Sequence, residues 1–313
     1  MITPILRPAP PTHYKFNNPI VFYHENCQDG FMCAYLLHRS LFELINLTKG
    51  YTKPQFIPVN YTTPPDLRTY NGLVGSDIFI VDFSFPRDVL EDLAKVANLY
   101  VFDHHKTSED ILAGLPYAVH DNSKCGARLV ANWISAFYKY QGIPWQFFEE
   151  TNKWIDYIED RDLWLWKQPH SKEFHAALSS YDMSFDVWST LDIESLINEG
   201  AAILRQQERT VRRIVENHRM LGINGYAVPT VNSPILQSEL GNYLCKDHPF
   251  AAIYHIDKDL GEVWSLRSDK NDLGAVDVSE IAKSFGGGGH KNAAGFYLRA
   301  GTGLITGSEY FRN

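Results

Sequence analysis

Short apolar runs alternate with amphipathic stretches along the first half of the chain. Strand-like runs lie at 19–25, 55–60, 77–83, 98–103 and 117–120, and helical periodicity is found at 31–46, 86–96, 125–140 and 146–159. The run Ile-Phe-Ile-Val at 78–81 is apolar throughout, which is typical of a strand buried on both faces of a parallel sheet. The alternation predicts an N-terminal α/β domain with a doubly wound, mainly parallel sheet.

The pattern changes in the second half. Residues 192–220 carry helical periodicity with few breakers and predict a connecting helix. Strand-like runs follow at 226–232, 250–256, 263–267 and 293–298, with helices near 236–246 and 278–284. We therefore predict a smaller C-terminal α+β domain. The expected boundaries are 1–191 for the first domain, 192–221 for the connection and 222–313 for the second domain.

Composition supports a folded chain with a small substrate. The 313 residues are enough for two domains of roughly 100–200 residues each. Hydrophobic residues make up 44%, which excludes a disordered chain. The formal net charge of −8 argues against a protein that coats long nucleic acid, because such binding is mostly electrostatic. A small anionic substrate held by metal ions or by a local cationic cleft stays possible.

The cysteines and the N-terminus indicate the compartment. None of the four cysteines forms a CxxC pair, which is typical of reduced thiols. The first 16 residues contain prolines where a signal peptide needs an apolar stretch, and no apolar run approaches the roughly 20 residues of a membrane span. We expect a cytoplasmic protein with no membrane partner. The oligomeric state is left open.

Acidic and imidazole side chains gather where the predicted strands end. The four groups are 24–30 (HENCQDG), Asp82, Asp103-His104-His105 and His120-Asp121. The carboxyl ends of neighbouring parallel strands meet at one edge, where such sheets bind ligands. Carboxylate and imidazole ligands suit manganese, zinc or iron. The pair His120-Asp121, taken alone, is more typical of a helix cap or a local hydrogen bond.

The groups also fit a pair of metal ions. Two ions that clamp a phosphoryl displacement need a bridging carboxylate and separate ligands on either side. Asp82, on the most buried strand, is the candidate bridge, and Asp29 and His104 would complete one site with a carboxylate from 154–164. Asp160 and Asp162 both lie there. Two residues apart on a helix, they point to different faces, so one ligand is expected, and we favour Asp160.

A glycine run marks the second domain. Residues 286–289 are all glycine, so successive backbone N–H groups can converge on an anion without interference from Cβ atoms. His290 follows directly, and Arg267 stands at the end of a predicted strand. Arg267, Gly287, Gly288, Gly289 and His290 therefore form a candidate phosphate clamp. The alternative, a flexible linker, is disfavoured because the run continues into the apolar sequence AAGF.

Four motifs together resemble a known family. They are the Asp-Gly element at 24–30, IVDFS at 80–84, VFDHHKT at 101–107 and GGGGHKNAAGF at 286–296. In this order they resemble the DHH phosphoesterase superfamily, in particular its branch with a glycine-rich, DHH-associated C-terminal domain. The resemblance implies two α/β domains, two divalent ions per chain (usually manganese, with magnesium possible) and hydrolysis of phosphoesters or phosphoanhydrides.

The resemblance also implies roles for single residues. Asp29, Asp82 and His104 match metal ligands, whereas Asp103 and His105 would orient them or contact the substrate, and His105 would assist proton transfer. Arg267 and His290 match substrate-side residues of the second domain.

The first motif departs from the common His-x-Asp-x-Asp-Gly pattern. Glu25 and Cys27 stand where the histidine and the first aspartate are expected, and His24 lies one residue early. His24, with or without Cys27, is therefore the candidate ligand.

These features predict a manganese-dependent phosphodiesterase that hydrolyses short single-stranded oligonucleotides, like an exonuclease, by a two-metal mechanism. The negative net charge and the lack of a Lys/Arg-rich run favour short substrates. Trp164 and Trp166 are candidates for stacking on a base. One alternative is a phosphodiesterase acting on a small or cyclic nucleotide. Another is a non-catalytic nucleotide-binding protein with a degenerate metal site.

Overall fold

The computed structural model describes residues 16–47, 53–61, 67, 72–142, 148–258, 261–299 and 304. The chain divides into two compact units, Met1–Leu204 and Arg205–Asn313, with the boundary inside helix α8 (Ile193–Val215). The prediction about a signal peptide rests on the N-terminal segment, of which residues 1–15 lie outside the described residues. Within the described ranges, no helix is both long and apolar enough to cross a membrane.

The first unit is built on a five-stranded parallel sheet in the order β2-β1-β3-β4-β5. The central strand is buried along its whole length, as the apolar run predicts. The strand order reverses between β1 and β3, and such a reversal is where parallel sheets of this kind bind ligands, at the carboxyl ends of the strands. The strands are β1 (Ile20–His24), β2 (Gln55–Val59), β3 (Asp77–Val81), β4 (Asn98–Asp103) and β5 (Ala118–His120).

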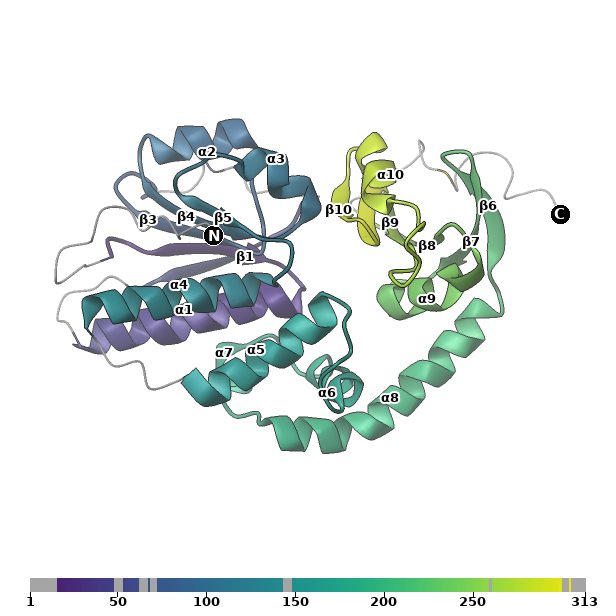
Figure 1. Ribbon diagram of the computed structural model, residues 1–313, viewed down its shortest axis with the longest axis horizontal. Helices are drawn as coiled ribbons and strands as arrows, with labels where there is room; N and C mark the ends of the chain where they lie inside the picture. Colours follow the sequence, from purple (N-terminus) through teal and green to yellow (C-terminus); the bar gives the residue numbers. More distant parts are fainter. Residues whose placement is uncertain are drawn as a thin grey trace. The chain divides into compact units, whose positions relative to one another are not determined.

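Helices cover both faces of this sheet (Figure 1). On one face lie α1 (Gln28–Leu47), α4 (Gly126–Gln141) and α5 (Phe148–Asp162), and on the other lie α2 (Arg87–Ala94) and α3 (Glu109–Leu112). Alternate residues of β3 pack into two separate apolar cores, one on each face of the sheet, with Phe79 in one and Ile78 in the other. The predicted doubly wound α/β domain is therefore confirmed. The remaining helices are η2 (Lys106–Ser108), α6 (Ser171–Leu178) and α7 (Phe185–Trp188).

The second unit is a six-stranded sheet in the order β10-β11-β9-β8-β7-β6. Only β7 and β8 pair in parallel. The strands are β6 (Arg219–Ile223), β7 (Tyr226–Asn232), β8 (Ala251–Asp257), β9 (Gly261–Arg267), β10 (Gly288–His290) and β11 (Ala293–Leu298). The helices are α9 (Gln237–Leu244), η3 (Cys245–Asp247) and α10 (Val278–Ser284). The predicted α+β character is confirmed, whereas the edge strands β6 and β10 were not predicted.

Candidate metal centre

The candidate centre lies at the carboxyl edge of the parallel sheet. His24 is the last residue of β1, Asp82 follows β3 directly, and Asp103 ends β4. Asp82 has a φ of 53°, in the left-handed region that a non-glycine residue rarely adopts. Such a conformation costs on the order of 1–3 kcal/mol and is most often retained at functional sites. The strain therefore marks Asp82 independently of its chemistry.

The two carboxylate oxygens of Asp82 face two different groups of side chains. Oδ2 lies 3.3 Å from Nδ1 of His24, and Oδ1 lies 3.1 Å from Nε2 of His104. Two sets of potential ligand atoms result, each within 4.8 Å of one another: His24, Asp82 and His105 in one set, and Asp29, His104 and Asp162 in the other. Asp82 thus touches both sets, which is the placement expected of a bridging carboxylate.

The second set is built against the beginning of α4. Nε2 of His104 lies 3.6 Å from Oδ2 of Asp29 and 3.4 Å from Oδ2 of Asp162. The carboxylate of Asp29 also accepts hydrogen bonds from the backbone N–H groups of Gly126 (2.6 Å) and Ala127 (2.8 Å). A Cβ atom at position 126 would lie 2.9 Å from Cβ of Asp82 and 3.0 Å from Oδ2 of Asp29. Glycine at this position therefore lets α4 approach both carboxylates.

A second glycine lets α1 begin directly beside β1. A Cβ atom at Gly30 would lie 2.7 Å from Cβ of His24. The intervening loop turns through Asn26, which has a φ of 54°. The Asp-Gly pair of the first motif is thus explained locally, because the aspartate points to the centre and the glycine leaves room for His24.

The carboxylate that α5 places beside His104 belongs to Asp162, not to Asp160. Oδ1 of Asp160 accepts a hydrogen bond from the backbone N–H of Lys167 (2.6 Å), and its Oδ2 accepts one from Gln168 (3.2 Å). Asp160 therefore closes the loop after α5 and belongs to neither ligand set. The structure thus brings Asp162, and not the predicted Asp160, next to His104, because the helical phase at the end of α5 directs Asp162 towards that histidine.

Of the candidate ligands in the first motif near its altered positions, His24 lies in a ligand set and Cys27 does not. Cys27 belongs to neither ligand set, and burial, with the charge of Asp82 adding to it, raises the pKa of its thiol well above the usual range. The thiol is therefore protonated at neutral pH. Glu25 lies outside both sets as well, and its Oε2 accepts a hydrogen bond from Nδ2 of Asn60 at 2.6 Å.

The electrostatics of the centre fit a bound cation. Burial raises the pKa of Asp29 well above its usual range, and the neighbouring carboxylates add to the rise. Burial also raises the pKa of Asp162. Among the described residues, Oδ2 of Asp162 has no hydrogen-bond partner although it is buried. Buried carboxylates that repel one another and keep an oxygen unsatisfied are compensated when a divalent ion binds, so the residues present fit such an ion.

His104 and Asp82 influence each other's pKa values in opposite directions. Burial alone would lower the pKa of His104, but the surrounding carboxylates raise it well above its usual range. Burial alone would raise the pKa of Asp82, but hydrogen bonds with His104 and His24 bring it well below its usual range. Asp82 therefore stays ionised more readily than Asp29 or Asp162, whose pKa values are raised.

Asp103 orients the two histidines that follow it. Its Oδ1 accepts hydrogen bonds from the backbone N–H groups of His104 (2.7 Å) and His105 (3.1 Å), and it lies 2.7 Å from Nδ1 of His105. Burial would raise the pKa of Asp103, but the charge of His105 lowers it to about 2. A carboxylate that holds Nδ1 leaves Nε2 of the imidazole for a metal or a substrate. Nε2 of His120 lies 2.9 Å from the His105 carbonyl oxygen, which agrees with the structural interpretation of that residue.

Comparisons with known proteins bear on the fold of the chain. No family model matches the chain. The chain is 29% identical over 313 residues to an uncharacterized protein of Acanthamoeba polyphaga mimivirus, covering 91% of this chain and 69% of that one. It is 26% identical over 251 residues to oligoribonuclease NrnB of Bacillus subtilis, covering 70% of this chain and 58% of NrnB. Among solved structures, RecJ of Thermus thermophilus in complex with Mn²⁺ matches with a TM-score of 0.52 and 16% identity, over 90% of this chain and 49% of RecJ. The chain has the DHH phosphoesterase fold.

The glycine run is used partly for chain packing. The backbone N–H groups of Gly286 and Gly287 donate to carbonyl oxygens at the end of α10, each at 2.9 Å. A Cβ atom at Gly287 would collide with the carbonyl oxygen of Gly295 on the neighbouring strand. Gly288, Gly289 and His290 form β10. The N–H of Gly287 is therefore committed to α10, which corrects its predicted place in an anion nest, and the assignment to the glycine-rich branch stays a prediction.

Arg267 and His290 share one side of the second sheet. Ala293 of β11 pairs with His290 on one side and with Arg267 on the other. Residues directly opposite one another on neighbouring strands project from the same face, so these two cationic or titratable groups flank a small residue. The stem of Arg267 lies against Gly241, because a Cβ atom built at position 241 would lie 2.7 Å from the Cβ of Arg267. Their role as a phosphate clamp stays a prediction.

Trp164 and Trp166 lie in the loop after α5, each with a φ of 53°. Their rings contact each other edge to face at 4.9 Å, and Trp166 lies 6.3 Å from the ring of His175. Neither ring contacts a ligand histidine in the part of the chain that the structure describes. Their role in base stacking stays a prediction.

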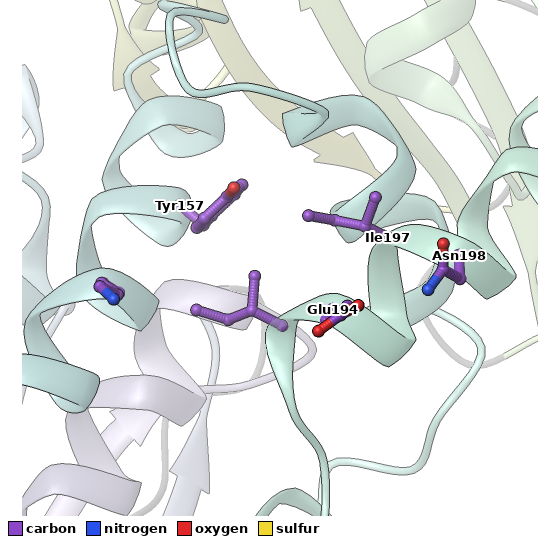
Figure 2. A pocket seen from close by; sticks show the side chains of 6 residues that line it. Tyr157, Glu194, Ile197 and Asn198 are labelled. Atoms are coloured by element: carbon purple, nitrogen blue, oxygen red, sulfur yellow. The ribbon is translucent and has the colours of Figure 1, made fainter.

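A hollow of about 390 Å³ lies between α5 and α8 (Figure 2). Its lining mixes apolar and charged side chains, which are Lys153, Tyr157, Ile193, Glu194, Ile197 and Asn198. None of them belongs to either ligand set. The carboxylates and histidines, rather than this hollow, therefore locate the chemistry.

His175 supports the first motif from behind and was not predicted, because no motif surrounds it. It is buried, with Nδ1 2.7 Å from Oε1 of Gln28, the first residue of α1, and Nε2 2.7 Å from the carbonyl oxygen of Tyr157. Burial lowers the pKa of His175 to about 3. The side chain therefore stays neutral in the folded protein, with Nε2 donating to the Tyr157 carbonyl oxygen and Nδ1 accepting from the Gln28 amide, whose oxygen and nitrogen are exchanged in this arrangement.

This burial predicts a loss of stability in acid. Between pH 6.5, the ordinary pKa of histidine, and about pH 3, the unfolded chain takes up a proton at position 175 and the folded chain does not. Stability should therefore fall with decreasing pH by up to about 1.4 kcal/mol per unit from this group. Urea unfolding at pH 7 and pH 5 measures the effect. The variant His175→Gln should show a smaller difference between the two pH values, and an equal difference would contradict the assignment.

Proposed function

We propose that this protein is a divalent-metal-dependent phosphodiesterase that hydrolyses short single-stranded oligonucleotides from an end. The observation that carries the proposal is the position of Asp82, whose two oxygens face two separate ligand sets at 3.3 and 3.1 Å. A shared carboxylate between two sets of oxygen and nitrogen ligands is the arrangement that phosphoryl-transfer enzymes with paired ions require.

The donor atoms favour manganese, with magnesium as the second choice. His24 and Asp82 would hold one ion beside His105, and Asp29, His104 and Asp162 would hold the other. Carboxylates suit manganese and magnesium, and the imidazoles of the centre shift the balance away from magnesium. Bound there, the ions would lower the pKa of a water molecule and neutralise charge that develops on the phosphate.

The chain's own residues position and transfer protons. Asp103 fixes the ring of His105 through Nδ1, so Nε2 keeps a constant direction. The raised pKa of His105, which burial alone would lower and the charge of Asp103 raises, allows it to hold a proton near neutral pH. We propose that His105 is not itself an ion ligand and that its Nε2 assists proton transfer to the leaving oxygen.

The second unit carries its own candidate residues for binding a phosphate group. Arg267 and His290 project from one face of its sheet, and Gly288 and Gly289 lie on the strand that carries His290. A charged guanidinium binds phosphate oxygens in a planar fork, and an imidazole adds a donor. The sparse positive charge of this arrangement favours a short substrate over a long one.

Oligonucleotides are the favoured substrate class. The relative NrnB is named an oligoribonuclease, and the chain covers 58% of its length. The alternative of a non-catalytic binder rested on the altered first motif, but His24 stands in the ligand set where that motif appeared deficient.

The test is a length series. End-labelled single strands from two to about twenty nucleotides, RNA and DNA in parallel, are incubated with Mn²⁺, with Mg²⁺ and with a chelator. We expect Mn²⁺-dependent release of mononucleotides, fastest for the shortest strands. Hydrolysis of only a cyclic or mononucleotide substrate would support the small-nucleotide alternative. Binding without turnover of any substrate would contradict an enzymatic function.

A further inference from the structure

An exposed tyrosine lies against the ligand histidines. Tyr61 follows the end of β2, and 46% of its surface is exposed. Its ring meets the ring of His24 edge to face at 5.6 Å and the ring of His105 at 5.9 Å. The two histidines belong to the same ligand set. An open aromatic face therefore borders the centre on the side of that set.

The ring is held from beneath. Phe83, which follows Asp82 directly and is 1% exposed, lies 4.4 Å from the Tyr61 ring, and Phe85 continues the contact into the core at 5.1 Å. The Tyr61 hydroxyl is hydrogen-bonded to the side chain of Ser108 and to the backbone of Ser84. A ring fixed at both its face and its hydroxyl loses little further freedom when a ligand stacks on it.

The same hydrogen bonds tie the ring to the centre. Ser108 also hydrogen-bonds Asp103, the carboxylate that orients His105. The hydroxyl of Tyr61 is therefore anchored beside the centre, while the residue as a whole stays exposed.

We propose that the exposed face of Tyr61 is the stacking site for the nucleobase next to the phosphate that is cleaved. This inference rests on the proposed function, since it assigns a subsite to the same centre. An organic cation is disfavoured on this ring, because a divalent ion bound beside His24 would repel it. A nucleobase is neutral, planar and covalently tied to the phosphate that the centre attracts.

Stacking sets the expected specificity. Every base offers a π face, so stacking tolerates sequence but requires that a base be present. The enzyme should accept all four bases and discriminate against a phosphodiester that carries none. This requirement separates a nucleotide subsite at Tyr61 from a general phosphodiester site.

The test compares a dinucleotide with its analogue in which both bases are replaced by hydrogen. For Tyr61→Ala we expect kcat/KM to fall by about 5- to 100-fold on the dinucleotide and to stay nearly unchanged on the abasic analogue. Tyr61→Phe keeps the ring and should retain the dinucleotide rate, whereas Tyr61→Leu keeps the bulk without the π face and should behave like alanine. Manganese titration checks that each variant still binds the ion.

Tyr140 offers a matched control. It is a similarly exposed tyrosine near the C-terminal end of α4, 14 residues or roughly 21 Å along the helix from Gly126 at the centre. Tyr140→Ala should leave both rates unchanged. An equal fall of both rates in Tyr61→Ala, or equal wild-type rates on the two substrates, would overturn the stacking site and leave the phosphodiesterase intact. Absence of metal-dependent hydrolysis of either substrate by the wild type would overturn both.

Discussion

Replacing Asp82 by asparagine should lower phosphodiester turnover by at least about 1000-fold, because the shared carboxylate contributes several kcal/mol of transition-state stabilisation and each 1.4 kcal/mol is tenfold in rate. The side chain is 1% exposed, and its two oxygens contact His24 and His104. Asparagine preserves the shape and one oxygen but removes the charge that two cations would share. Manganese binding should fall from two ions per chain to one or none, measured by calorimetry.

Asp77 provides the control for this substitution. It begins the same strand, β3, is equally buried, and accepts a hydrogen bond from the backbone N–H of Asn17 at 2.6 Å. It lies at the amino edge of the sheet, away from the centre. Asp77→Asn should reduce the free energy of unfolding but leave turnover per folded molecule unchanged. Turnover within tenfold of the wild type in Asp82→Asn, with two ions still bound, would contradict the bridging role.

The edge of the sheet that carries the centre could be predicted from the sequence, because the order of residues along each strand shows which residues lie at its carboxyl end. A fully apolar run followed by an acidic residue indicates a buried strand and its carboxyl end, and Asp82 and His104 follow from that reasoning. Asp29 follows in the same way from the start of the helix after β1. These residues were identified because the chain direction alone places them.

Other residues of the centre depend on packing that sequence does not reveal. The choice between Asp160 and Asp162 depends on the phase of α5 at its last turn, where the loop amides of Lys167 and Gln168 recruit Asp160. Tyr61 follows a strand that lies at the edge of the sheet, beside β1 only in the folded chain. No local pattern signals either outcome.

The glycine run shows why a motif can have two causes. Consecutive glycines indicated an anion nest, yet Gly287 is required where β11 approaches closely, and its N–H completes the end of α10. Either need selects a residue without Cβ. The sequence pattern alone therefore cannot separate a ligand-binding amide from a packed one, whereas the hydrogen-bond partner can.

Replacing Asp162 by asparagine should have opposite effects on metal binding and on stability. Burial, with the charge of Asp82, raises the pKa of Asp162, so ionised Asp162 destabilises the metal-free fold at neutral pH. The neutral amide removes that cost, and the melting temperature of the metal-free variant should rise by roughly 2–4 °C for each kcal/mol gained. Manganese affinity should fall by more than about 100-fold, since loss of even an indirect partner costs 10- to 100-fold.

Asp160→Ala is the matched variant with the reverse signature. The side chain of Asp160 is buried and its carboxylate accepts two backbone hydrogen bonds, so its loss should reduce stability by about 1–3 kcal/mol and leave manganese affinity unchanged. Thermal melts with chelator and with Mn²⁺ measure both quantities in one experiment. The pair of variants separates a carboxylate retained for the metal from one retained for the fold. If Asp160→Ala loses the metal and Asp162→Asn keeps it, the assignment of Asp162 as the metal ligand from α5 is wrong.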